Sequence, residues 1–280
     1  MSREVILAGW VHRIRDHGGV VFIDLRDRQG ITQLVIRAED SPEPYQLVKE
    51  IRPESVIGIA GKVLQRGPEN INSSLSTGQI EVRVKRLEVF NLADPLPFPL
   101  EGQTLAGEEL RLKYRYLDLR RPRYQDIFRL RHRVSLAVRR YLDEREFLEI
   151  ETPALTKSTP EGSREYLVPS RINPGSFYSL PQSPQLFKQI LMISGFDRYF
   201  QIARCYRDED LRSDRQPEFT QIDIEMAFVQ KQQIFELING LMEVIFRTAG
   251  KTLNRPYPIL DYAEAMERFG TDKPDFRFGM

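Results

Sequence analysis

The residues best suited to chemistry lie around a charged loop, 208–217, that joins two predicted strands, 199–207 and 218–228. Six side chains of mixed type flank this loop: Arg207, Asp208, Glu209, Phe219, Gln221 and Asp223. Arginine can hold a phosphate or a carboxylate through two parallel hydrogen bonds, an acid can accept from an amino group, and a phenylalanine ring offers a flat surface to a base. The pattern therefore favours a nucleotide site without a glycine-rich phosphate loop, which the sequence lacks. A surface ion-pair network remains the alternative.

Alternation along the second strand separates its polar and apolar side chains, because successive residues of a strand point to opposite faces. One face carries Phe219, Gln221, Asp223 and Glu225, and the other carries Thr220, Ile222, Ile224 and Met226. We expect the apolar face to pack on helices and the polar face to line a cavity.

A predicted helix that begins near Ser183 supplies two further polar side chains. Ser183 suits the N-cap, Pro184 the first helical position, and Gly195 the residue after the last turn. Gln185 and Lys188 are three residues apart, so they share one face of this helix and suit a single small ligand.

The first 91 residues predict short strands separated by glycines and charged turns. The five expected strands are 5–11, 20–25, 31–36, 56–63 and 79–89. A helix is expected at 44–51, between the third and fourth strands. That order is typical of the OB-fold, a small barrel with a face that binds oligonucleotides. A β-domain that binds no nucleic acid remains the alternative.

A proline-rich segment, 91–107, separates this barrel from a region of different character. There, apolar residues at helical spacing predict a long helix at 123–146, followed by a strand at 147–155 and a polar loop at 156–164. We therefore predict an α+β chain in three parts: a barrel at 1–91, a linker at 92–122, and a sheet flanked by helices at 123–280.

Composition limits the class of protein. The net charge is only +1, but residues 111–140 hold eleven Lys and Arg against two acids, which suits either a phosphate backbone or a solvated helix face. One cysteine, Cys205, cannot form an internal disulfide, and the three histidines give no zinc-site spacing. No apolar run is long enough to cross a bilayer and no apolar leader follows the first residues, so we expect a soluble cytoplasmic protein.

Four stretches of the sequence resemble motifs of the bacterial-type aspartyl-tRNA synthetases, which are class II enzymes. They are motif 2 in FQIARCYRDEDLRSDRQPEFTQIDIE (200–225), motif 1 in FLEIETP (147–153), the amino-acid-binding helix in LPQSPQLFKQ (180–189), and the flipping loop in TKSTPEGSREYLVP (156–169). The resemblance extends over essentially all 280 residues, including GWV at 9–11 and residues 22–27. It implies an OB-fold barrel followed by part of the class II antiparallel sheet with its flanking helices.

The resemblance also implies a two-step reaction, in which ATP activates L-aspartate and the aspartyl group passes to the 3′ end of tRNA(Asp). Arg207 would be the catalytic residue, because it would bridge the α-phosphate and the substrate carboxylate. ATP would contact Arg207, Asp208, Glu209, Gln216 and Phe219. Aspartate would contact Glu161, Gln185, Lys188, Arg207 and Asp223. Mg²⁺ is expected to accompany ATP, and no protein ligand for it is identified.

In the barrel, the resemblance implies contacts to the tRNA anticodon. The implied residues are Arg13, Arg15, His17, Phe22, Gln33 and Glu81, with Phe22 stacked on a base. Taken alone, a strand phenylalanine is more often a core residue. Relatives that also charge tRNA(Asn) tend to carry histidine at the place of His17, where strictly aspartate-specific relatives tend to carry leucine. We therefore expect tRNA(Asn) as a second partner.

The sequence departs from the family's pattern in two places. Glu146 stands where the family usually has glycine, and nothing resembles motif 3, whose arginine holds ATP. We therefore expect an N-terminal portion that lacks motif 3. The family implies a homodimer through motif 1, with Pro153 near the twofold axis. Asparaginyl- and lysyl-tRNA synthetases share the barrel and the hairpin, but residues 182–188 and 269–275 favour the aspartyl type. A non-catalytic fragment that binds an anticodon remains the alternative.

Overall fold

The computed structural model of the chain describes residues 3–102, 106–159, 162, 164–210, 212 and 215–277. The chain divides into two compact units, Met1–Asp118 and Leu119–Met280, here named the barrel unit and the sheet unit. This division falls inside the predicted linker 92–122, and the exact boundaries 1–91, 92–122 and 123–280 stay a prediction.

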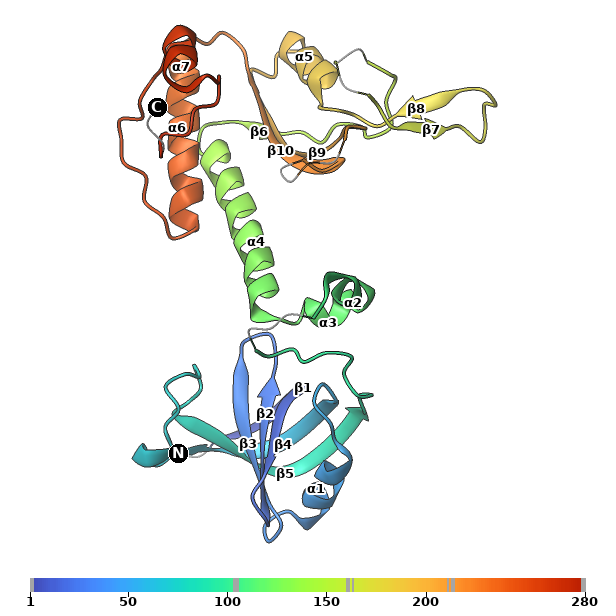
Figure 1. Cartoon of the computed structure of the whole chain (residues 1–280), viewed down its shortest axis with the longest axis vertical. Helices are drawn as coiled ribbons and strands as arrows, with labels where there is room; N and C mark the ends of the chain where they lie inside the picture. Colours follow the sequence, from blue (N-terminus) through green and yellow to red (C-terminus); the bar gives the residue numbers. More distant parts are fainter. Residues whose placement is uncertain are drawn as a thin grey trace. The chain divides into compact units, whose positions relative to one another are not determined.

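Within its described residues, the barrel unit contains a closed five-stranded barrel in the order β1-β2-β3-β5-β4 (Figure 1). The strands are β1 Glu4–Asp16, β2 Val20–Arg26, β3 Ile31–Arg37, β4 Val56–Gln65 and β5 Ile80–Asn91. Neighbouring strands pair antiparallel except β3 and β5, whose parallel pairing closes the barrel. The predicted barrel is thus confirmed, with each expected strand in place.

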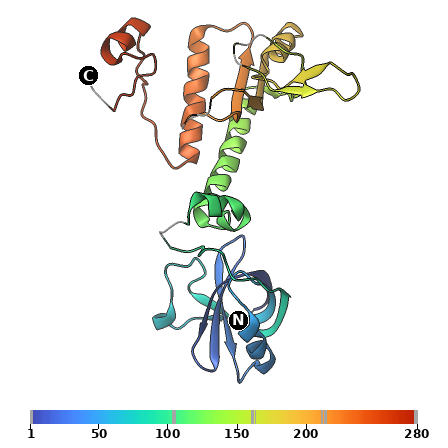
Figure 2. The ribbon, with the colours of Figure 1, turned by 45° about the vertical axis from the view of Figure 1, so that its right-hand side comes forward.

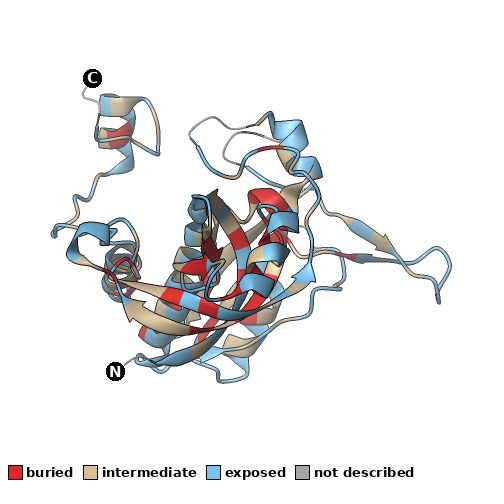
Figure 3. Cartoon of the chain, turned by 90° about the horizontal axis from the view of Figure 1, so that it is seen from below, coloured by how far each residue is buried: buried red, intermediate tan, exposed pale blue. Residues whose placement is uncertain are grey.

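The barrel core follows the two-residue period of its strands. On β2, Val21, Ile23 and Leu25 point inward, and all three are at most 3% exposed. Figure 3 shows such buried positions gathered inside the barrel. Each large aliphatic side chain removed from water contributes about 1.5–3 kcal/mol. This core makes the barrel a rigid frame for the polar side chains on its outer face.

The helix predicted at 44–51 is placed differently in the structure. Helix α1 spans Pro42–Leu47, and a 3-10 turn, η1, follows at Val48–Glu50. Proline is favourable at the first helical position because a backbone N–H there would have no partner within the helix. A 3-10 turn commonly ends a helix. A second 3-10 turn, η2, spans Pro68–Asn70.

The segment predicted as a linker is not free of structure. Two short helices, α2 Glu108–Lys113 and α3 Arg115–Asp118, lie within it. Upstream of them the chain lies on the barrel, because the Ala93 amide donates to Ser55 Oγ at 3.1 Å and Phe98 is only 4% exposed.

The described part of the sheet unit is built on a three-stranded sheet in the order β10-β9-β6. Its strands are β6 Leu148–Glu149, β9 Arg198–Tyr206 and β10 Glu218–Met226, and a separate hairpin joins β7 Leu167–Pro169 to β8 Phe177–Ser179. The helices are α4 Pro122–Asp143, α5 Gln185–Ile193, α6 Lys231–Thr248 and α7 Tyr262–Phe269. Figure 2 shows α7 apart from the sheet, at the end of an extended segment.

Helices α4 and α6 pack together and against one face of the hairpin formed by β9 and β10. Ile224 and Met226 contact an apolar cluster that these helices share with Phe200. Tyr141 of α4 donates to the Leu237 carbonyl at 2.9 Å. The prediction that the apolar face of β10 packs on helices is confirmed at this end, although Ile222 is 39% exposed.

Two other predictions for the sheet unit were wrong in extent. The strand expected at 147–155 pairs only at Leu148 and Glu149, where it runs parallel to β9. Pro153 has no N–H to donate, which disfavours a longer ladder. Helix α5 begins at Gln185, not at Pro184, although Ser183 Oγ still accepts from the Gln185 amide at 3.3 Å.

No described helix is long and apolar enough to cross a membrane.

Candidate functional site

A buried ion cluster lies where α5 meets the polar face of the β9–β10 hairpin. Lys188 of α5 is 8% exposed, and its Nζ lies 2.9 Å from Asp223 Oδ1 and 3.2 Å from Glu225 Oε2. Helical spacing points Lys188 toward the sheet, and strand alternation puts both carboxylates on one face of β10. The structure therefore joins two predicted aspartate contacts, Lys188 and Asp223, and adds Glu225.

The charges of this cluster are unequal, with one ammonium facing two carboxylates. Burial alone would lower the pKa of Lys188, but the hydrogen bonds to Asp223 and Glu225 outweigh burial and raise it, so the ammonium keeps its charge. Asp223 Oδ2 is buried and has no hydrogen-bond partner among the described residues. The cluster thus offers a ligand both a fixed cation and a free acceptor.

A second part of the site lies further along the same face of the hairpin. The Arg207 guanidinium lies over the Phe219 ring, 5.1 Å from its centroid. Arg207 Nε is buried and has no hydrogen-bond partner within the described part of the chain. Such an arginine can still donate to an anion, and the half-buried ring beside it can contact a base.

The two parts are separated by a distance that the strand sets. Phe219 and Asp223 are four residues apart on β10, and an extended strand rises about 3.3 Å per residue, which gives about 13 Å. A ligand that uses both parts would be elongated, with an aromatic base near Phe219 and a charged group near Lys188.

Three other predicted ATP contacts are exposed at the tip of the hairpin: Asp208, Glu209 and Gln216. Glu209 accepts from Arg215 at 3.5 Å. Gln185 is half-buried in the first turn of α5. Glu161 lies outside the described residues.

A carboxylate that was not predicted, Glu165, joins the segments around the site. Glu165 Oε1 accepts from the Thr159 amide at 2.9 Å, and Ser158, Ser179 and Gln182 also donate to this carboxylate. Burial would raise the pKa of Glu165, but the hydrogen bonds together outweigh it and lower the pKa below its ordinary value. Nothing in the local sequence indicates this role, because Ser179 and Gln182 come from a different segment.

Tyr166, also missed, ties this segment to the hairpin. Its hydroxyl donates to the Asp208 carboxylate, and the Asp208 amide donates to the Arg164 carbonyl at 3.0 Å. Glu225, in contrast, could have been found, because alternation puts it on the same face as Asp223.

On the barrel, five of the six predicted anticodon residues contact one another on an outer face. Arg15 donates to Asp24 at 2.7 Å and to Gln33 at 3.3 Å, and Gln33 donates to Glu81 at 3.2 Å. The rings of His17 and Phe22 meet edge to face at 5.6 Å, and the Arg15 guanidinium lies 5.9 Å from the Phe22 centroid.

Two features of this face bear on its use. Phe22 is half-buried on the outer side of β2 and so is not a core residue. Arg13 stands opposite Asp24 in the strand register, but its guanidinium is bound by Glu101. Asp24 and Glu101 were not predicted as part of this face.

The basic block 111–140 is partly neutralised by nearby acids. Arg111 contacts Asp118 within the barrel unit, and in the sheet unit Arg129 contacts Asp126. The Asp118 side chain is fully buried, so its pair with Arg111 belongs to the packing of this unit.

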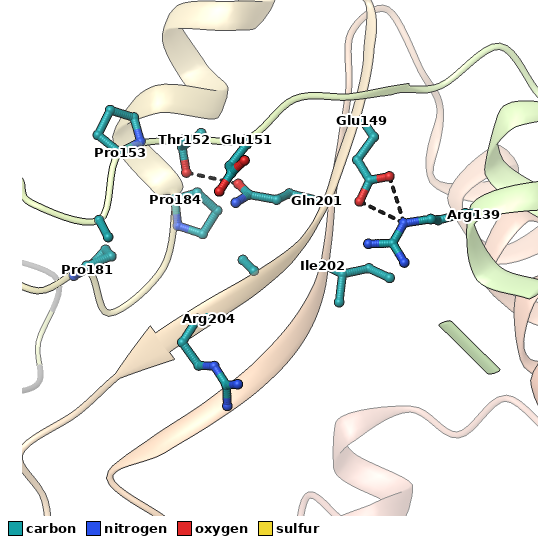
Figure 4. A pocket seen from close by; sticks show the side chains of 12 residues that line it. Arg139, Glu149, Glu151, Thr152, Pro153, Pro181, Pro184, Gln201, Ile202 and Arg204 are labelled. Carbon is teal, nitrogen blue, oxygen red and sulfur yellow. Dashed lines mark hydrogen bonds and ion pairs between the residues drawn. The ribbon is translucent and has the colours of Figure 1, made fainter. Parts of the chain in front are cut away.

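A pocket of about 530 Å³ lies beside β6 and β9 (Figure 4). Arg139 donates to Glu149 on one wall, and Thr152 donates to Gln201 at 2.9 Å on another. Pro153 also lines it, so the pocket belongs to the segment predicted at a dimer interface.

The described residues contain no group of three or more His, Cys, Asp or Glu side chains that could hold a metal ion. We therefore assign no protein ligand to the expected Mg²⁺, and no step proposed below depends on one.

Comparison with known proteins gives the family. The family model of class II tRNA synthetases (D, K and N) matches residues 107–280, and that of the OB-fold nucleic acid binding domain matches residues 5–90. Aspartate–tRNA(Asp/Asn) ligases of Halothermothrix orenii and Aquifex aeolicus are each 55% identical over the whole chain. The chain spans 48% and 47% of their lengths.

Two solved structures agree in fold. A putative aspartyl-tRNA synthetase of Leishmania major is 26% identical with a TM-score of 0.78, over 89% of this chain and 50% of that one. Asparaginyl-tRNA synthetase of Pyrococcus horikoshii, complexed with asparaginyl-adenylate, is 26% identical with a TM-score of 0.77, over 88% and 55%. The barrel, the class II hairpin and these matches together place the chain in the class II tRNA synthetase family of the D, K and N type.

Proposed function

We propose that this chain is part of an aspartate–tRNA ligase, which activates L-aspartate with ATP and transfers it to tRNA(Asp). One observation carries the proposal: the buried Lys188 ammonium lies on the same hairpin face as Arg207 and Phe219. A fixed cation suits the side-chain carboxylate of aspartate, whereas the neutral amide of asparagine cannot replace a carboxylate partner of Lys188 with another negative charge.

The site residues divide the work of the first step. Phe219 stacks on adenine, and Glu209 accepts from the adenine amino group. Arg207 donates both to the α-phosphate and to the substrate carboxylate, which holds the reacting atoms together and offsets the charge that builds between them. Its unpartnered Nε supports this role.

The substrate's ammonium and side chain bind at the other end of the site. Lys188 exchanges one of its two carboxylate partners for the side chain of aspartate. Asp223, with its free acceptor oxygen, offsets positive charge there, and Gln185, Glu161 and Gln216 complete the proposed contacts. Mg²⁺ bound to ATP would neutralise phosphate charge.

Aspartate-dependent exchange of pyrophosphate into ATP tests this function. The intact protein should catalyse exchange with aspartate and not with asparagine or lysine. Exchange that depends on asparagine or lysine would refute the aspartyl assignment.

The barrel supports a second candidate function, binding of an anticodon without catalysis. The observation in its favour is that the polar face around Phe22 lies on a compact unit of its own. A binding module would hold an anticodon stem-loop of tRNA(Asp) and give no pyrophosphate exchange. Given the relatives' names and His17, we also propose tRNA(Asn) as a partner of the intact ligase.

We further propose that the intact ligase is a cytoplasmic homodimer. The resemblance of residues 147–153 to motif 1 supports contact through this segment. Light scattering of the intact protein at micromolar concentration should give twice the mass of one chain, and a monomer would refute the dimer.

A further inference from the structure

The segment that leaves the barrel is held on it by a contact that solvent can reach. Glu101 binds both His12 and Arg13 of β1. The Glu101 and Arg13 side chains are 44% and 54% exposed, whereas Phe98, which anchors the same segment, is 4% exposed. An incoming anion can therefore reach the Arg13–Glu101 pair without opening the barrel core.

A β-bulge explains how two successive residues reach one carboxylate. Alternation would send His12 and Arg13 to opposite sides of β1, but the pairing of β1 with β2 shifts between Val11 and Arg13. A bulge adds one residue to a strand and redirects its side chain. The barrel thus presents two adjacent donors to a single anion.

Arg26 fixes the His12 ring through Nδ1, the ring nitrogen that does not face Glu101. Arg26 Nη1 lies 3.1 Å from His12 Nδ1, and a guanidinium can only donate, so Nδ1 accepts. The hydrogen of the neutral ring is then on Nε2, which faces Glu101. Arg26 itself is held by two hydrogen bonds to Glu54, at 2.8 and 2.6 Å.

Arg13 also belongs to the outer face proposed to meet RNA. It pairs in register with Asp24, which accepts from Arg15, and Arg15 reaches Gln33. Glu101 therefore sits at the edge of this face, on one of its exposed cations. A carboxylate and an RNA phosphate each present two oxygens to an arginine, so they compete for the same donors.

We propose that Glu101 is an intramolecular competitor of the RNA backbone for Arg13, and that RNA bound on the barrel releases residues 100–102 from it while Phe98 stays buried. The inference rests on the proposed binding of an anticodon. RNA brings several phosphates to the face at once, whereas Glu101 offers a single carboxylate. Anticodon binding would thereby change how the chain leaves the barrel.

The test uses the full 280-residue chain and a labelled anticodon stem-loop of tRNA(Asp), with affinity measured by fluorescence anisotropy at several salt concentrations. Glu101→Gln removes the competing charge and keeps the side-chain shape. Glu4→Gln is the matched control, because Glu4, like Glu101, is exposed and paired with a cation, in this case Lys85. It corrects for the general gain in RNA affinity when any negative charge is lost.

We expect Glu101→Gln to bind the stem-loop about threefold to fivefold more tightly than Glu4→Gln, the effect of one exposed ion pair. In an Arg13→Gln background the two variants should bind alike. Hydrogen exchange at the amides of residues 100–102 should become faster when the wild-type chain binds RNA.

Two results would overturn the inference: equal affinities of Glu101→Gln and Glu4→Gln, or unchanged hydrogen exchange at residues 100–102 on RNA binding. Both would leave the proposed function standing, since RNA would still bind. Failure of the wild-type chain and of Glu101→Gln to bind the stem-loop would instead refute anticodon binding itself, and the inference with it.

Discussion

Removing the Lys188 ammonium should destabilise the sheet unit and leave the barrel unit unaffected. In Lys188→Ala, Asp223 and Glu225 would share a buried face without their cation. Breaking a fully buried pair costs about 3–5 kcal/mol. The Glu225 side chain is 31% exposed, so water screens part of the repulsion, and we expect about 2–3 kcal/mol.

The chain offers an internal control for this measurement. Its one tryptophan, Trp10, lies on β1, so tryptophan fluorescence reports unfolding of the barrel unit. Circular dichroism at helical wavelengths reports chiefly the sheet unit, which holds the long helices α4 and α6. For a unit of this size, the expected loss should lower the dichroism midpoint by about 5–10 °C.

Lys251→Ala is the matched control, because Lys251 is exposed beyond α6. It should change the stability by less than about 0.5 kcal/mol. Equal midpoints for the two variants would refute a buried, charge-bearing role for Lys188. A shift of the fluorescence midpoint in Lys188→Ala would show that the loss is not local. In the intact ligase, Lys188→Ala should also weaken aspartate activation by at least about 30-fold while tRNA binding persists.

Three further predictions test other parts of the chain. Glu146→Gly should stabilise the sheet unit by about 0.5–1 kcal/mol relative to Glu146→Ala, since Glu146 has a φ of +63°. At the exposed helical position Glu236 of α6, Gly should instead cost about 1 kcal/mol relative to Ala. If thermal melts rank Gly and Ala in the same order at both positions, backbone strain at Glu146 is contradicted. Hydrogen bonds lower the pKa of Glu165 from 4.5, so its contribution to stability is present above pH 4.5 and is lost as the pH falls through the lowered pKa of the folded state. Glu165→Gln should therefore flatten the acid side of a plot of stability against pH. An unchanged acid side would exclude a stabilising role of the Glu165 carboxylate. His17→Leu in the intact ligase should reduce charging of tRNA(Asn) more than that of tRNA(Asp), and an equal effect on the two purified tRNAs would reject His17 as a selector.

Much of the fold followed from periodicity. Strand β10 alternates between polar and apolar residues, so its two faces could be assigned residue by residue before any coordinates. The same period put Phe219 and Asp223 on one face, and helical spacing put Gln185 and Lys188 on one face of α5. The strand at 147–155 was overextended because composition cannot say how far a partner strand accompanies it.

The reason why the family usually has glycine at the position of Glu146 could not be predicted from the sequence. The resemblance identified a glycine position, but only the structure gives the reason, a left-handed φ of +63° just before Phe147 enters the core. Glutamate is accommodated there with its carboxylate 3.3 Å from Arg198 Nη1. An exposed pair of this kind offsets only part of the backbone strain.

The parts of the site that escaped prediction are those that depend on contacts between distant segments. Glu165 is a surface-type residue in a polar stretch, and its importance appears only when Gln182 and Ser179 are found donating to it. Asp208 was predicted to contact ATP, yet its amide and carboxylate tie the hairpin to the segment at 164–166. Both acids therefore position the groups that face a ligand. A substitution at Asp208 would disturb this positioning as well as any direct contact, so loss of ATP binding in such a variant would not by itself assign Asp208 to the nucleotide.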